Sequence, residues 1–258
     1  ENGDIIEIKD SHNPLIIMSE NFNTEKTEGT PLFTKWENKK LLFKVTTKYP
    51  EFEINASHDH AFFVRTDKGI EEKTLCDIKE GDYLLIPEKI EVKGEKQKID
   101  FIPLIKSRSM KKIDIPETID ENLSRLLGYY LGDGSYEIDR ISFSEQRKEV
   151  AEYYCSLIKQ CFKIEPSLKF RENKGYYQIR GGSRIIAQLF KFIFIENNKT
   201  LNQKIPSIIL KSKDKILASF IAGFFDAEGY VSKGRVAAGF NNERLAKQLY
   251  TNEVTKNG

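Results

Sequence analysis

The sequence predicts a chain of two parts: a mostly β N-terminal part, and an α+β C-terminal part built as a pseudo-twofold repeat with the order α-β-β-α-β-β-α. Short apolar runs with strand-like alternation fill residues 41–87. After residue 119 the pattern changes to amphipathic helices that alternate with pairs of short strands. Two similar apolar segments, Leu126–Gly134 and Ile221–Gly229, recur 95 positions apart in this second part and indicate an internal repeat.

The composition is that of a soluble protein with room for two modest domains. The chain has 258 residues, of which 39% are hydrophobic and 31% charged. No apolar run reaches the roughly 20 residues of a membrane span, and residues 1–10 do not resemble a signal peptide. We therefore expect a soluble cytoplasmic protein with no membrane partner. Cys76, Cys155 and Cys161 show neither a CxxC pair nor metal-ligand spacing, so we expect buried thiols.

The charge is distributed unevenly between the two parts. Residues 1–119 hold 19 basic and 23 acidic side chains, whereas residues 120–258 hold 22 basic and 16 acidic ones. A basic excess confined to the second part is typical of a domain that binds a polyanion, although solvated lysines would produce it too.

The N-terminal elements are short strands followed by a lysine-rich stretch. Strands are expected at residues 41–47, 52–57, 61–66 and 83–87, with a turn at Asp67–Gly69. Residues 88–119 contain prolines and show no sustained helical period, so they suit a linker or a peripheral segment. The predicted domains are residues 1–90 and 120–258, with residues 91–119 between them.

The C-terminal elements follow from apolar periodicity and from turn residues. Helices are expected at residues 123–133, 148–162 and 183–194, and strand pairs at residues 136–144 and 167–180. The first repeat covers residues 120–200. The second begins near residue 214 with a helix to residue 228, followed by a strand pair and the start of another helix, and we expect it to be incomplete.

Small residues recur at matching places in the two similar segments. Gly128 and Gly132 lie four positions apart in the first, and Gly223 and Ala227 in the second. On a helix such residues share one face and allow another backbone to approach closely. The two helices are therefore expected to pack against each other along these faces.

An acid precedes the terminal glycine of each segment: Asp133 before Gly134, and Glu228 before Gly229. A helix C-terminus carries partial negative charge, so an acid there is unfavourable by some tenths of a kcal/mol, and two packed ends increase the repulsion. Clustered acids at such a place favour a divalent-cation site. The alternative is a helix pair whose acids simply point to solvent, and the repetition of the acid argues against it.

Both segments resemble the dodecapeptide (DOD-type) motif of LAGLIDADG homing endonucleases, and Asn202–Pro206, with Lys204 at its centre, resembles the Lys-x-Pro block of intein-borne members. The resemblance covers residues 120–250. It implies site-specific cleavage of double-stranded DNA, with Asp133 and Glu228 as catalytic ligands of Mg2+ or another divalent cation such as Mn2+. The sixth motif position is Leu131 in one copy and Asp226 in the other; both substitutions look tolerable, since the acid there is not the principal ligand.

The resemblance also implies that the hairpins lie in the DNA major groove, which admits a two-stranded ribbon. A solvated sheet face is the alternative, but six basic residues and only two acids lie between Lys163 and Arg184. The expected DNA-binding residues are Arg140, Ser142, Ser144, Lys169, Arg171, Gln178, Arg180, Lys204, Lys233 and Arg235.

Residues 55–64 and 76–83 resemble, more weakly, blocks of the Hint splicing domain of inteins. By this match His60 assists rearrangement of the N-terminal scissile amide, since a histidine can donate and accept protons near neutral pH. The chain begins with Glu1 in place of a nucleophile and has no terminal His-Asn, so we expect a partial splicing domain that does not splice by itself.

The first functional interpretation is therefore an intein-associated homing endonuclease, monomeric at full length, whose parent intein acts on host exteins in cis. The second is a cleavage-inactive LAGLIDADG DNA-binding protein or RNA-splicing cofactor. The third is a Hint-type autoprocessing protein without nuclease function, which the basic repeat disfavours.

Overall fold

The computed structural model describes residues 15–21, 26–32, 41–48, 52–86, 94–104, 113–194 and 203–256. The chain divides into two compact units. Described residues up to Ile86 belong to the first, called here the β unit, and those from Gly94 onward belong to the second, the α/β unit. Among the residues that the structure describes, no helix combines the length and the apolar character that crossing a bilayer requires.

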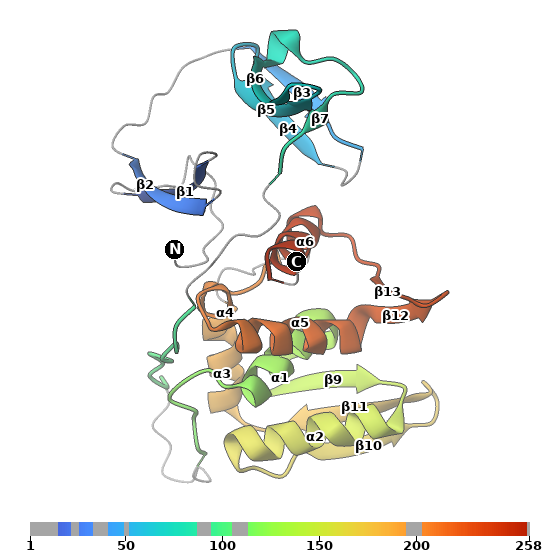
Figure 1. Ribbon diagram of the computed structural model, residues 1–258. Helices are drawn as coiled ribbons and strands as arrows, with labels where there is room; N and C mark the ends of the chain where they lie inside the picture. Colours follow the sequence, from blue (N-terminus) through green and yellow to red (C-terminus); the bar gives the residue numbers. More distant parts are fainter. Residues whose placement is uncertain are drawn as a thin grey trace. The chain divides into compact units, whose positions relative to one another are not determined.

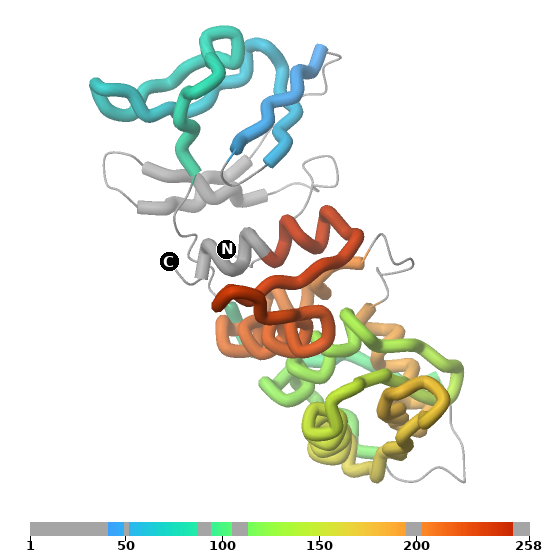
Figure 2. Tube along the Cα trace, turned by 90° about the vertical axis from the view of Figure 1, so that its right-hand side faces the viewer, coloured from blue at the N-terminus to red at the C-terminus, as the bar shows by residue number. Residues whose placement is uncertain are grey.

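The β unit consists of antiparallel hairpins, of which those within residues 41–86 are the blue-to-teal segments of Figure 2. Its strands pair as β1-β2, β3-β4 and β6-β5-β7. The predicted strands are confirmed, although the last is only two residues long. Within residues 41–86, of those described, only Ala56 and Val64 are buried, so this unit has a thin core. The elements are β1 Leu15–Asn21, β2 Lys26–Leu32, β3 Leu42–Thr46, β4 Glu53–Ser57, β5 Ala61–Thr66, β6 Gly69–Thr74, a 3-10 turn at Leu75–Asp77, and β7 Tyr83–Leu84.

The α/β unit has the predicted order of elements. Each predicted helix and strand pair is found within about two residues of its expected bounds, and one short helix, α4, was not predicted. The elements are α1 Glu121–Asp133, β8 Gly134–Glu137, β9 Arg140–Glu145, α2 Lys148–Phe162, β10 Ser167–Arg171, β11 Tyr176–Gly181, α3 Arg184–Ile193, α4 Ser207–Leu210, α5 Asp214–Glu228, β12 Gly229–Ser232, β13 Arg235–Ala238 and α6 Glu243–Lys256.

The main sheet has the antiparallel order β10-β11-β9-β8. Its register pairs Ile179 with Phe143, and both side chains are buried. The neighbouring pair, Gln178 with Ser144, therefore lies on the opposite face, because successive side chains of a strand alternate. One face of the sheet thus joins the hydrophobic core, and the other is polar.

Helices α1 and α5 lie side by side at the centre of the unit (Figure 1). A Cβ added to Gly128 would lie 1.9 Å from the carbonyl oxygen of Phe220, and one added to Gly223 would lie 2.1 Å from that of Arg125. Glycine is therefore required at both positions. Beside this contact the Ser124 hydroxyl donates a buried 2.6 Å hydrogen bond to the Ile216 carbonyl.

An offset of 95 relates the elements that the two halves of the unit share. It converts the first residues of β8, β9 and α2 into those of β12, β13 and α6. It also converts Arg125 into Phe220 and Gly128 into Gly223, so the two glycine contacts are equivalent. The pairing of α1 with α5 consequently has approximate twofold symmetry.

Glycine follows each of these helices without the left-handed conformation that is common after a helix C-terminus. Gly134 and Gly229 have φ values of −77° and −84°, which are extended and not left-handed. Glycine is needed for space instead: a Cβ on Gly134 would lie 2.4 Å from the Tyr130 carbonyl oxygen, and one on Gly229 2.2 Å from that of Phe225. Each helix therefore passes directly into a strand.

Part of the segment expected as a linker or peripheral stretch packs into the α/β unit. Ile99 and Ile119 belong to its hydrophobic core. The Glu95 amide donates to the Lys211 carbonyl at 2.9 Å, and the Leu104 amide donates to the Gln188 side chain at 3.2 Å. We call residues 94–104 the strap.

The glycine contacts generate a stability prediction. Gly128→Ala or Gly223→Ala forces the two helix backbones apart, so we expect each to lower the free energy of unfolding by about 1–3 kcal/mol or more. Gly182→Ala is the matched control, because its Cβ would meet nothing within 4 Å. Urea unfolding of the three variants measures the effect, and equal stabilities would contradict the close approach.

Candidate functional site

Two carboxylates meet where α1 and α5 converge. Asp133 is the last residue of α1, and Glu228 is the last residue of α5. A Cβ on Gly132 would lie 2.6 Å from the Cβ of Ala227 and 3.0 Å from the Cγ of Glu228, so the small residues at this point allow the helix ends to approach. The residues that the sequence singled out as acids and as small contacts are thus brought together.

The pKa of Asp133 is raised to about 6. Partial desolvation between the helix ends contributes most, followed by the negative charges of Glu228 and Glu145, while the positive charge of Arg147 opposes the shift. The side chain nevertheless keeps an exposed side. An acid that is repelled by its neighbours and open to solvent is suited to bind a cation, which would relieve the repulsion.

The described residues contain no group of three or more His, Cys, Asp or Glu side chains arranged to hold a metal ion. A pair of carboxylates still fits Mg2+, which proteins usually bind through one or two carboxylates together with waters and substrate phosphates. Asp133 and Glu228 supply oxygen ligands of this kind. The two acids therefore fit a magnesium site that waters and a phosphate would complete.

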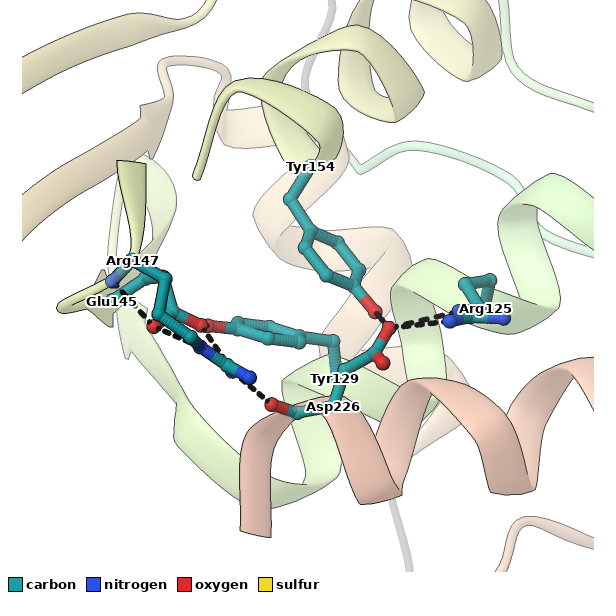
Figure 3. Close-up of polar contacts among 6 residues, drawn as sticks. All are labelled: Arg125, Tyr129, Glu145, Arg147, Tyr154 and Asp226. Atoms are coloured by element: carbon teal, nitrogen blue, oxygen red, sulfur yellow. Dashed lines mark hydrogen bonds and ion pairs between the residues drawn. The ribbon is translucent and has the colours of Figure 1, made fainter. Parts of the chain in front are cut away.

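A buried acid lies beside this pair. Glu145, at the end of β9, accepts hydrogen bonds from the Tyr129 hydroxyl at 2.8 Å and from Arg147 Nε and Nη2 at 3.0 and 2.8 Å (Figure 3). Burial acts to raise the pKa of Glu145, but the bonds from Arg147 and Tyr129 lower it overall. Glu145 is thus held as an anion, and the exposed Arg147 guanidinium is fixed close to the carboxylate pair.

Asp226, the acid at the sixth motif position, takes part in a different network. Its Oδ2 atom accepts from Arg125 Nη2 at 2.6 Å and from the Tyr154 hydroxyl at 2.5 Å. Arg147 donates to its backbone carbonyl at 2.6 Å (Figure 3). Asp226 therefore joins α5 to α1 and α2.

Sequence reasoning missed the partners in these networks. The signals were weak: Glu145 is an acid in a strand of buried residues, and Arg147 immediately precedes α2. Their pairing depends on the tertiary structure.

The polar face of the main sheet gathers the expected DNA-binding residues of the first half. The register pairs Ser142 with Arg180, Ser144 with Gln178 and Lys169 with Gln178, which places these side chains on one face. Arg171 donates to the Gln178 side-chain oxygen at 2.9 Å.

An acid that was not expected, Glu137, lies on the same face. It accepts from Ser142 Oγ at 2.9 Å, and its other oxygen is 3.2 Å from Arg140 Nε. The Arg180 Nη2 atom is 4.0 Å away, and Arg180 Nε is buried without a hydrogen-bond partner. Glu137 thus lies among three of the expected DNA-binding residues.

The other candidates lie outside this face. Lys204 precedes α4, and Lys233 and Arg235 lie at the β12-β13 turn, where Lys233 has a φ of 51°. His60 belongs to the β unit; it is exposed, its amide donates to the Ser57 carbonyl at 3.0 Å, and its ring centroid is 5.0 Å from that of Phe62.

The cysteines are all free. The expectation of buried thiols is wrong for Cys76, which is exposed because it lies in the 3-10 turn Leu75–Asp77, where no residue is buried. The Cys76 amide and thiol both donate to the His58 carbonyl. Cys155 and Cys161 are partly buried, and desolvation raises the pKa of their thiols to about 11 and about 12.

Comparisons with known proteins give several distant relatives, and the chain matches no protein-family model. Glutamine–fructose-6-phosphate aminotransferase [isomerizing] of Methanocaldococcus jannaschii is 32% identical over 53% of this chain and 13% of its own length. An A-type ATP synthase subunit of Pyrococcus abyssi is 24% identical over 66% of this chain and 16% of its own length. Transcription initiation factor IIB of M. jannaschii is 24% identical over 90% and 34%.

The chain therefore spans between 13% and 34% of the length of these relatives. Among solved structures, that of I-DmoI in complex with DNA and Mn is similar over 52% of this chain and 76% of that chain, with 17% identity and a TM-score of 0.38.

The acid pair generates a prediction about protonation. In metal-free protein the Asp133 carboxyl should titrate near pH 6, and Glu228→Gln should move its pKa toward the ordinary value of 3.8 because a repelling charge is removed. Asp139→Asn is the control, since Asp139 is paired with Arg140. Carboxyl NMR titration measures both, and an unchanged Asp133 midpoint in Glu228→Gln would contradict the coupling.

Stability should follow the same shift. The pKa of Asp133 in the folded state, about 6, lies above its ordinary value of 3.8, so protonation of this carboxyl stabilises the fold. That stabilisation is fully present below pH 3.8 and is lost as the pH rises through about 6. Asp133→Asn should therefore stabilise metal-free protein above pH 6. The gain, measured by urea unfolding, is on the order of 1 kcal/mol after allowance for solvent screening.

Proposed function

We propose that the α/β unit is a LAGLIDADG-type homing endonuclease that cleaves double-stranded DNA at specific sites by divalent-metal-dependent phosphodiester hydrolysis. The observation that carries the proposal is the twofold-related helix pair, whose matching ends bring Asp133 and Glu228 together. Two equivalent acids beside a twofold axis suit a substrate with two equivalent strands. A duplex has this property, and few small substrates do.

The roles of the residues follow from their positions. Asp133 and Glu228 would hold the cation, which when bound supplies Lewis acidity toward a phosphodiester. The exposed guanidinium of Arg147, held by Glu145, adds positive charge next to the acid pair and favours the approach of a phosphate. Desolvation and repulsion between the acids would be relieved when the cation binds.

DNA would be bound along the polar face of the main sheet. A two-stranded ribbon fits the major groove, and this face carries basic and amide side chains aligned by the strand register. Lys169 and Arg171 suit phosphate contacts, while Gln178 and Arg180 suit hydrogen bonding to base edges. Lys204, Lys233 and Arg235 would extend the contact into the second half.

We further propose that the chain derives from an intein. Support comes from the relatives, whose names share no activity although each resembles this chain over a minor share of its own length. A segment inserted into unrelated hosts accounts for that pattern. The β unit would then be the splicing domain, with His60 assisting amide rearrangement and host exteins as partners in cis.

The main test of the nuclease proposal uses Asp133→Asn and Glu228→Gln. Each removes a metal-binding charge and preserves shape, so we expect loss of cutting with DNA binding largely retained. The assay uses supercoiled plasmids with randomised inserts in Mg2+ or Mn2+, alongside retention of the same DNA in Ca2+. Glu152→Gln, an exposed acid of α2, is the control. Near wild-type cutting by either site variant refutes the assigned roles, and binding without cutting by the unaltered chain supports the cleavage-inactive alternative.

A second test addresses the DNA-binding face. Replacing Lys169, Arg171 and Arg180 by alanine should weaken DNA binding and reduce its salt dependence. Each lost phosphate contact makes the negative slope of log K against log salt shallower by about 1. The control replaces Lys148 and Lys159, which lie on α2 and pair with acids there and in the following loop. An unchanged slope in the first variant would show that the face is merely solvated.

A further inference from the structure

The contact between α1 and α5 is twofold in geometry but unequal in chemistry. The offset of 95 that makes Gly128 and Gly223 equivalent also converts Arg125 into Phe220 and Leu131 into Asp226. The position pair 125 and 226 on one side of the axis therefore corresponds to the pair 220 and 131 on the other. The first pair is charged, and the second is apolar.

On the charged side, Arg125 and Asp226 are hydrogen-bonded to each other. Arg125 donates to Asp226 Oδ2 from Nη2 at 2.6 Å and from Nε at 3.0 Å, and the Tyr154 hydroxyl donates to the same oxygen (Figure 3). Both charged side chains are about 30% exposed. Each is therefore largely removed from water and depends on the other for its hydrogen bonds.

The apolar side holds side chains of the core. Phe220 is completely buried, and Leu131 is 3% exposed. The next equivalent pair shows the same contrast: the Tyr129 hydroxyl is bonded to Glu145 in the first half, and in the second half the rings of Phe224 and Phe240 lie 5.2 Å apart. Polar contacts on one side of the axis are thus replaced, position by position, by apolar ones on the other.

We infer that this asymmetry makes α1 and α5 a selective pair, in which the charges of Arg125 and Asp226 decide which helix each one accepts. The glycines alone do not provide this selectivity, because both helices carry one at the equivalent place. With the same geometry, two α1 helices would set Arg125 against Leu131 on both sides of the axis. Two α5 helices would set Asp226 against Phe220 twice.

The native pairing differs in free energy from the two like pairings because a like pairing leaves charged side chains without partners. A charge that loses its partner while it stays out of water is strongly unfavourable, and each like pairing creates two such charges. The native pairing creates none. Selectivity of this kind, obtained by penalising the competitor, is a general way to choose between partners of the same shape. The complementary half is therefore the partner that this surface fits.

The test separates the two charges into two chains. In a chain with Arg125→Asp, acids face each other across the seam, and in a chain with Asp226→Arg, two cations do. Alone, each variant should melt at a lower temperature than the unaltered chain. In an equal mixture, the altered helix of one chain complements the altered helix of the other, so reciprocal exchange of halves restores two correct ion pairs.

The measurement labels one variant with a donor and the other with an acceptor, refolds the mixture from urea, and records energy transfer and melting temperature. We expect transfer and a recovered melting temperature in the mixture, and no transfer between two labelled samples of the unaltered chain. The double variant Arg125→Asp with Asp226→Arg should recover within a single chain and exchange little. As a control, the ion pair within α2 is reversed by Lys148→Glu in one chain and Glu152→Lys in the other, which should cause no exchange.

These readouts do not involve DNA or cleavage, so they are independent of the nuclease proposal. Mixtures that show neither transfer nor recovery would overturn the inference, and so would exchange by the unaltered chain at the level of the mixed variants. If each single variant fails to fold by itself, recovery in the mixture remains the decisive result.

Discussion

The close approach of α1 to α5 is the constraint on which the rest of the α/β unit depends. Two backbones can lie this near only where side chains are missing, and Gly128 and Gly223 supply that space at equivalent points. The helix axes, the strands that continue directly from the helix ends, and the position of the acid pair all follow. A carboxylate at each helix end then becomes a neighbour of the other by geometry.

The same close approach explains why like charges repel one another at the acid pair. Two acids at helix C-termini, near a buried third acid, oppose one another, and Arg147 offsets this only in part. Above about pH 6 such an arrangement destabilises the metal-free fold. The polar network around Asp226 and the apolar core around Phe220 stabilise the helix pair that the acids oppose.

Much of this architecture could be predicted because its signals are local. Helix α2 begins and ends where its amphipathic period predicts, and α5 ends at its acid-glycine step. The repeat itself disclosed Asp133 and Glu228. The networks could not be predicted in this way, because Arg125 meets Asp226 across 101 positions of chain. The reason for Gly134 could not be predicted either, since it depends on the space beside Tyr130.

The strap has a consequence for how the unit could be inherited. Ile99 lies in the core, and the strap is hydrogen-bonded to both α3 and the end of α4 through Gln188 and Lys211. A gene fragment that started at the first repeated helix would encode a unit with a hole where Ile99 and Ile119 belong. The smallest gene segment that encodes the complete α/β unit therefore starts before Gly94. Recombination that moved this segment between genes would be tolerated only with breakpoints upstream of the strap. The boundary of the inherited segment should therefore coincide with the boundary of the packed unit.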